Sequence, residues 1–331
     1  MTTYSNDDID AAISAGVLTQ ATADAFREHV EKRLAQPSGD EEHFRLVTGF
    51  NDIFVVIACA LLLLSVGWIG NSFAPLVGAV AVAIAAWGLA EFFVRKRRMA
   101  LPAICLLLAF VASSYYAGAL LLPDGKGATI IGPLLAALGA WVHWRRFHVP
   151  ITIAAGLIPV VILVTTLGAG LLGGPEFLLP IMLLAGIAVF VLAMRWDAQD
   201  RARQTRSSDV AFWLHLLAAP LIVRPVFSAI NTLGDDADIV RVLAVGALYG
   251  LIALVSLAID RRALMVSALA YVLYAFSALL EDSGVVSLSF AITALVIGSA
   301  LLMLSAFWHP SRMALLKRLP AGLRRRVTAD I

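Results

Sequence analysis

The stretch NDIFVVIACALLLLSVGWIG, residues 51–70, decides the fold class of this 331-residue chain. After Asp52 it holds no charged side chain. A helix of about 20 apolar residues, rising 1.5 Å per residue, crosses a hydrocarbon core about 30 Å thick. We therefore predict a membrane-spanning helix over 52–70. The fifty residues before it are polar, so this span is expected to act as an uncleaved signal anchor.

The composition extends this interpretation to the whole chain. Apolar residues make up 60% and charged residues 15% of the sequence, and the mean hydropathy is +0.88. Because a soluble domain has about 25% charged residues, this composition excludes an ordinary soluble globular fold. We expect an all-α polytopic membrane protein with ten spans, at 52–70, 74–94, 99–122, 128–144, 149–170, 177–194, 210–230, 239–259, 263–281 and 288–308.

The positive charges predict the orientation of these spans. If the N-terminus is cytoplasmic, the inner segments contain 22 of the 25 lysines and arginines. The four outer loops contain only Lys126, and the other two, Arg224 and Arg241, lie in or at the ends of spans. Cytoplasmic loops of membrane proteins carry an excess of lysine and arginine. We therefore predict that both termini are cytoplasmic. The compact loops and the arginine- and alanine-rich composition indicate the inner membrane of a bacterium.

The two ends of the chain are predicted to lie outside the membrane. Residues 1–36 are expected to form a cytosolic pair of short helices around Gly16, with Asn6 and Thr19 as their N-caps. The second helix has one apolar stripe, Phe26, Val30 and Leu34, which predicts docking on the membrane domain, on a protein partner or on a second copy of the chain. Residues 37–51 have the composition of a linker, and 52–308 form the membrane domain. The tail 309–331 carries six basic residues, which attract anionic lipid headgroups.

Spans 1–4 and 7–10 share a sequence of features that indicates a parallel repeat. Each block opens with an acid, Asp52 or Asp209, and has a basic turn after its second span. A span with two tyrosines and an acidic outer turn follow in each block. The blocks end in WVHWRRFHVP (141–150) and SAFWHPSR (305–312). Parallel repeats are one of the symmetries on which transporters are built.

Span seven contains the residues that we single out as a candidate cavity site. The run FWLHLLAAPLIVRPVF, residues 212–227, places His215, Pro220, Arg224 and Pro225 among apolar side chains. Each proline removes a backbone hydrogen bond, so we expect this helix to be bent or locally unwound, as at many transporter binding sites. His215 either bonds to a neighbouring helix or handles protons. Arg224 either extends to the outer surface or faces a cavity and holds an anion.

Two ion pairs are the remaining candidate sites, and the sequence contains no catalytic signature. Glu91 precedes Arg95 by four residues, which is ideal for an ion pair on one helix face. Asp238 and Arg241 are a second candidate pair at the start of span eight. Cys59 and Cys105 are interpreted as small core residues. No cofactor, metal or nucleophile signature is found, no nucleic-acid partner is expected, and no loop is long enough for a substrate lid, so we do not expect an enzyme.

The GVLT-bearing helical pair, the polar linker and TGFNDIFVVIACALLLLSVGWIG resemble uncharacterised bacterial multi-span inner-membrane proteins with a cytosolic helical segment before the first span. The resemblance covers residues 8–70 and implies no activity, because such families have none assigned. We expect a small-solute or ion transporter-like protein. The alternative is a non-catalytic scaffold or regulatory subunit that acts through its cytosolic ends.

Overall fold

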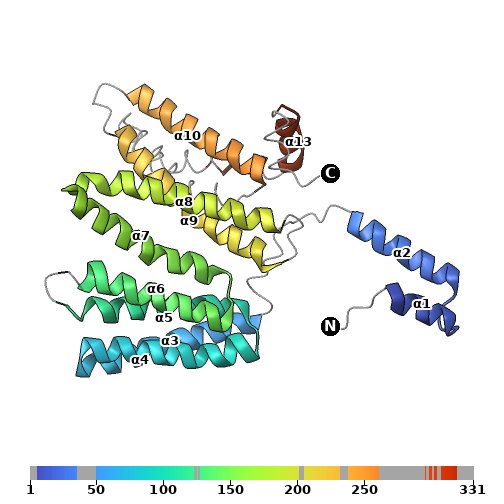
Figure 1. The fold of residues 1–331 in the computed structure, drawn as a ribbon, viewed down its shortest axis with the longest axis horizontal. Helices are drawn as coiled ribbons and strands as arrows, with labels where there is room; N and C mark the ends of the chain where they lie inside the picture. Colours follow the sequence, from blue (N-terminus) through green and yellow to red (C-terminus); the bar gives the residue numbers. More distant parts are fainter. Residues whose placement is uncertain are drawn as a thin grey trace. The chain divides into compact units, whose positions relative to one another are not determined.

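The computed structural model describes residues 6–35, 50–122, 125, 127–200, 205–231 and 238–260, and toward the C-terminus residues 295, 298–299, 302–303 and 307–318. The regular elements in these ranges are all helices (Figure 1). The chain divides into two compact units, Met1–His43 and Phe44–Ile331.

The N-terminal unit contains α1 (Asn6–Ser14) and α2 (Gln20–Ala35), as predicted around Gly16. Gly16 turns the chain with a φ of +72°, which glycine adopts without steric cost. The Thr19 hydroxyl accepts a hydrogen bond from the Thr22 amide at 3.3 Å, which confirms it as the N-cap of α2. Arg27 joins the two helices through a 2.6 Å ion pair with Asp10, and this bond raises the pKa of the exposed Arg27 guanidinium.

In the described part of the larger unit, seven helical segments are long and apolar enough to cross a membrane. Their α-helices are α3 (Phe50–Phe73), α4 (Pro75–Ala90), α5 (Ala100–Ala119), α6 (Gly132–Phe147), α7 (Ile151–Leu172), α8 (Leu178–Gln199) and α9 (Arg206–Asn231). The π-helical turn η1 (Glu91–Lys96) extends α4, η2 (Gly127–Ile131) begins α6, and the 3-10 turn η3 (Pro175–Phe177) precedes α8.

These helices coincide with the first seven predicted spans, and α10 (Asp238–Ile259) coincides with the eighth. Span nine, 263–281, lies outside the described residues, and span ten, 288–308, is described only at isolated positions. The predicted repeat depends on these two spans, including Tyr271 and Tyr274, and stays a prediction.

Consecutive helices run antiparallel, so the turns between them alternate between two ends of the bundle (Figure 1). We name the end with the turns 97–99 and 148–150, where α8 also ends and α9 begins, the basic end, and the opposite end the far end. Helices α3 to α6 each pack against the next helix along the chain, and α8 packs along α9. Two buried clusters meet at the half-buried Trp213, one from α5, α6 and α7 and one from α7, α8 and α9.

Glycines allow the helix hairpins to close tightly at the far end. A Cβ at Gly118 of α5 would lie 2.8 Å from the Gly132 Cα of α6, and a Cβ at Gly70 of α3 would lie 2.6 Å from the Gly78 Cα of α4. Small residues permit this close approach of helix backbones in membranes. The Tyr115 hydroxyl adds a hydrogen bond to the Ala128 carbonyl at 2.8 Å, across the same α5–α6 hairpin.

The helix α13 (Trp308–Arg318) contains the first part of the predicted basic tail. It packs against the end of α10, where the buried Asp260 accepts a hydrogen bond from the Trp308 indole at 2.8 Å. Arg312 lies 3.7 Å from the same carboxylate. Asp260 therefore holds this helix against α10. No spacing in the sequence predicts the contact between Asp260 and Trp308, because 48 residues separate them.

Candidate functional site

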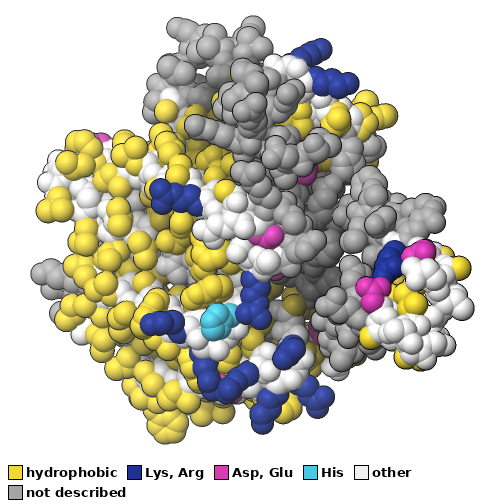
Figure 2. All heavy atoms as spheres, turned by 45° about the vertical axis from the view of Figure 1, so that its right-hand side comes forward, with side chains coloured by type: hydrophobic (Ala, Val, Ile, Leu, Met, Phe, Trp, Pro, Cys, Tyr) yellow, Lys and Arg dark blue, Asp and Glu magenta, His cyan; other side chains and the backbone are white. Residues whose placement is uncertain are grey.

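Arginines from three separate segments gather at the basic end of the bundle. Arg95 lies in the last turn of η1, and Arg98 lies in the turn that follows it. Arg146 lies in the last turn of α6, and Arg206 is the first residue of α9. Figure 2 shows this face, with dark blue arginine and lysine side chains around a histidine. The chain returns to this end after every second helix, so segments more than a hundred residues apart in sequence meet here.

A pocket of about 390 Å³ lies among these residues. Arg95, Arg98, Arg146, Arg206 and the exposed His148 contribute to its wall. Its apolar lining includes Ile104 of α5, Ile151 of α7 and Trp213 of α9. The volume falls within the range of small-molecule sites, about 300–1,000 Å³. Such a pocket offers guanidinium groups to an anion and an apolar surface to the rest of the ligand.

One carboxylate, Glu91, binds two of these arginines. Arg146 donates from Nε to Glu91 Oε1 at 2.6 Å and from Nη2 to Oε2 at 3.0 Å. Arg95 adds the predicted i,i+4 pair at 3.4 Å. This bidentate contact orients the Arg146 guanidinium between η1 and α6. Within the described residues no ion pair involves Arg98 or Arg206, so the cluster keeps an excess of positive charge.

Two residues of the pocket adopt a backbone conformation that side chains other than glycine rarely take. Arg98 and His148 both have a φ of +54°. His148 caps α6, its amide donating to the Trp144 carbonyl at 3.0 Å, and after Arg98 the Met99 amide donates to the Phe93 carbonyl at 3.1 Å. Helix C-caps of this kind usually hold glycine. The left-handed conformation costs about 1–2 kcal/mol for a residue with a Cβ, and such strain clusters at functional sites.

Three other basic residues of this end lie against aromatic rings and do not line the pocket. The Arg145 guanidinium is 4.9 Å from the centroid of the Trp141 ring. Lys96 and Arg97 lie 6.0 Å and 5.6 Å from the centroid of Phe92. These three residues face outward and make cation–π contacts. They are therefore matched controls for experiments on the pocket.

The structure places the predicted residues of span seven in separate environments. His215 is fully buried, with Nδ1 2.8 Å from the Ala211 carbonyl and 3.9 Å from the Asp197 carboxylate of α8. Arg224 is exposed, whereas Pro225 is buried and Pro220 half-buried. Asp197 has no spacing in the sequence that relates it to His215, because the two residues lie on different helices.

Helix α9 stays helical from Arg206 to Asn231 through both prolines, so the predicted local unwinding is not found. Each proline removes one hydrogen bond, and the buried residues Val223 and Phe227 continue the packed face around Pro225. The second predicted ion pair, Asp238 with Arg241, lies in the first part of α10, whose side chains are outside the described residues.

His143 is the second fully buried histidine, on α6. Its Nδ1 is 3.4 Å from the Thr152 hydroxyl, and its ring contacts Trp87, Phe110 and Phe147, with the Phe147 centroid at 4.5 Å. This environment is that of a packed core residue.

Comparison of the chain with protein-family models, with curated proteins and with solved structures found no match.

Proposed function

We propose that this protein is an inner-membrane protein of a bacterium that binds a phosphate-bearing anion in the basic pocket. In this proposal the chain has ten spans and both termini in the cytoplasm, so the basic end is cytoplasmic. The observation that carries the proposal is the convergence of Arg95, Arg98, Arg146 and Arg206 on one pocket with Glu91 as the bound counter-charge.

Arginine is suited to this ligand class for geometric reasons. Its planar fork donates two parallel hydrogen bonds to a phosphate or carboxylate, and its charge is constant at physiological pH. Basic pockets between membrane helices at the cytoplasmic side bind phosphate-bearing headgroups. Among the two expected classes, a transporter-like protein for small anionic solutes is the one that a ligand pocket supports, because a scaffold needs none.

Arg206→Gln is expected to abolish most of the response to phosphate. The measurement is the melting temperature of the purified protein in detergent, followed by tryptophan fluorescence, with phosphate or chloride added at equal ionic strength. A ligand that binds the native state raises its stability, so phosphate should raise the melting temperature of the wild type more than chloride does. Arg145→Gln, which removes a charge from the same end but outside the pocket, should keep the full response.

Two further additions distinguish the sources of the phosphate group. Dispersed phosphatidylglycerol is compared with phosphatidylcholine, which carries no net charge. A response to free phosphate identifies a soluble ligand, and a response to phosphatidylglycerol alone identifies a lipid headgroup. The proposal is overturned if phosphate and both lipids act no differently from chloride, or if Arg206→Gln and Arg145→Gln respond alike.

The scaffold function is the second candidate, and the N-terminal unit favours it. Val17 and Phe26 are 77% and 54% exposed, which leaves apolar side chains of α1–α2 uncovered. Deleting residues 1–36 separates the two functions: a scaffold loses self-association or a co-purifying partner, whereas phosphate binding in the pocket is retained.

A further inference from the structure

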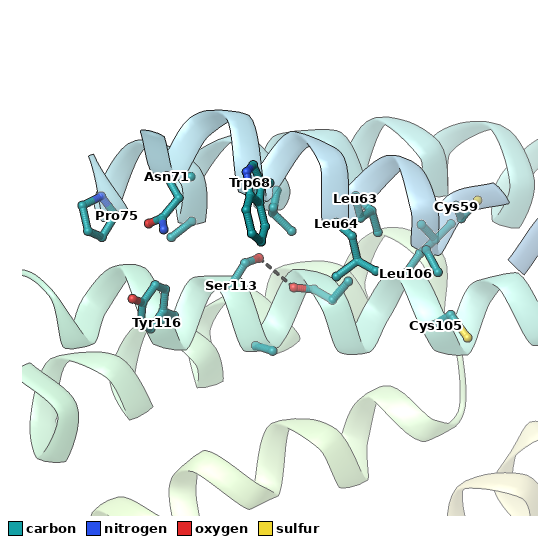
Figure 3. Close-up of a pocket in the computed structure, with 17 residues that line it drawn as sticks. Cys59, Leu63, Leu64, Trp68, Asn71, Pro75, Cys105, Leu106, Ser113 and Tyr116 are labelled. Atoms are coloured by element: carbon teal, nitrogen blue, oxygen red, sulfur yellow. Dashed lines mark hydrogen bonds between the residues drawn. The ribbon is translucent and has the colours of Figure 1, made fainter. Parts of the chain in front are cut away.

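A second cavity lies between α3, α4 and α5, away from the arginines of the basic pocket. It has a volume of about 690 Å³ and opens at the surface of the bundle (Figure 3). Small residues of all three helices form part of its wall, namely Ala60, Gly67, Gly78, Ala79, Ala109 and Ala112. We name this cavity the lateral groove. Because α3, α4 and α5 are apolar enough to cross a membrane, an opening between them would face lipid in a membrane.

The polar groups of the lateral groove lie toward the far end. Asn71 of α3 and Tyr116 of α5 are near the far-end turns, and both are exposed. The other end is closed by Cys59, Cys105 and the fully buried Leu106. In Figure 3, Asn71 and Tyr116 lie at one end of the groove and the cysteines at the other. A ligand that matches this distribution is polar at the membrane surface and apolar within the membrane.

The dimensions of the lateral groove fit one hydrocarbon chain. From Cys59 to Asn71 the helix α3 rises about 18 Å, close to one leaflet, which is half of a core about 30 Å thick. A groove of this length matches one acyl chain, which extends through one leaflet.

We propose that the lateral groove binds one acyl chain of a membrane lipid, with the polar headgroup beside Asn71 and Tyr116 at the far end. The chain would lie along the small residues of α3 and α5 and would be held by van der Waals packing against them. This site is separate from the basic pocket, which shares no lining residue with the groove and takes an anion.

Two alanines on α3 give a matched test of this proposal. Ala58 and Ala60 are both exposed, but only Ala60 lines the groove. After thorough detergent exchange, we expect phospholipid to remain bound to the wild type and to Ala58→Phe, as measured by mass spectrometry. Ala60→Phe should retain several-fold less, and so should Ala112→Phe on the facing helix. Arg206→Gln, the variant of the basic pocket, should retain as much as the wild type.

The unmodified chain provides a second readout, because Cys59 and Cys105 are its only cysteines and both line the groove. Adding a single-chain phospholipid to the delipidated wild type should slow labelling by N-ethylmaleimide several-fold. Equal lipid retention by the two α3 variants together with unchanged labelling would overturn the proposal. A lower oligomeric mass of Ala60→Phe at unchanged lipid content would also overturn it, since the groove would then be an interface between copies.

Discussion

Replacing Arg98 by glycine is expected to stabilise the protein while weakening its binding of phosphate. At φ +54° a residue with a Cβ is strained by about 1–2 kcal/mol, and glycine removes this strain. Glycine also gives the unfolded chain more conformational freedom, which cancels part of the gain in stability. The net effect is a rise of the melting temperature by about 2–4 °C. Losing one charge-assisted contact of about 1.5–3 kcal/mol should reduce affinity roughly ten- to a hundredfold.

The opposite signs of these two effects separate binding from folding. Melting temperature and phosphate affinity are measured on the same preparation by tryptophan fluorescence and isothermal titration calorimetry. The control, Arg98→Lys, keeps both the charge and the strained backbone, so it should gain no stability and retain part of the affinity. If Arg98→Gly loses stability and affinity together, Arg98 serves the fold and has no direct contact with the anion.

Gly118→Val is expected to destabilise the membrane domain by about 3 kcal/mol or more, since overpacking a close-packed site forces backbone shifts. The added Cβ would lie 2.8 Å from both the Gly132 Cα and the Ile131 carbonyl oxygen. Both are backbone atoms, so the α5–α6 hairpin must open and would lose the Tyr115 hydrogen bond.

The matched control is Gly88→Val, because a Cβ at Gly88 on α4 meets no atom within 4 Å. Melting temperature and gel filtration after purification compare the two. Gly88→Val should behave as the wild type, whereas Gly118→Val should melt markedly earlier or fail to yield monodisperse protein. Similar behaviour of the two variants would show that the tight contact in the hairpin is not needed.

Local features of the sequence predicted the helices well. The length of each apolar run and the charged turns between them located α3 to α10, because a helix must satisfy its own backbone in lipid. The i,i+4 spacing likewise predicted the Glu91–Arg95 pair, and the spacing after Gly16 predicted the cap at Thr19. Each of these relations lies within one helix or one turn.

The candidate site could not be predicted in this way, because it depends on how distant turns meet. Glu91 binds Arg146 at a separation of 55 residues, and Arg206 reaches the same pocket only through the packing of α9. In the sequence these arginines cannot be told apart from the basic residues that occur in any cytoplasmic turn of a membrane protein. For the prolines of span seven a local rule predicted a bent or locally unwound helix; α9 is not unwound, and the bend stays a prediction.

The most direct test of the basic pocket is an experimental structure of the protein with tungstate, a phosphate mimic that is located by its anomalous scattering. We predict an anion in the pocket, within hydrogen-bonding distance of the guanidinium groups of Arg98 and Arg206 and beside the Arg146–Glu91 pair. An empty pocket at saturating tungstate, or an anion held at Arg224 in its place, would contradict the account.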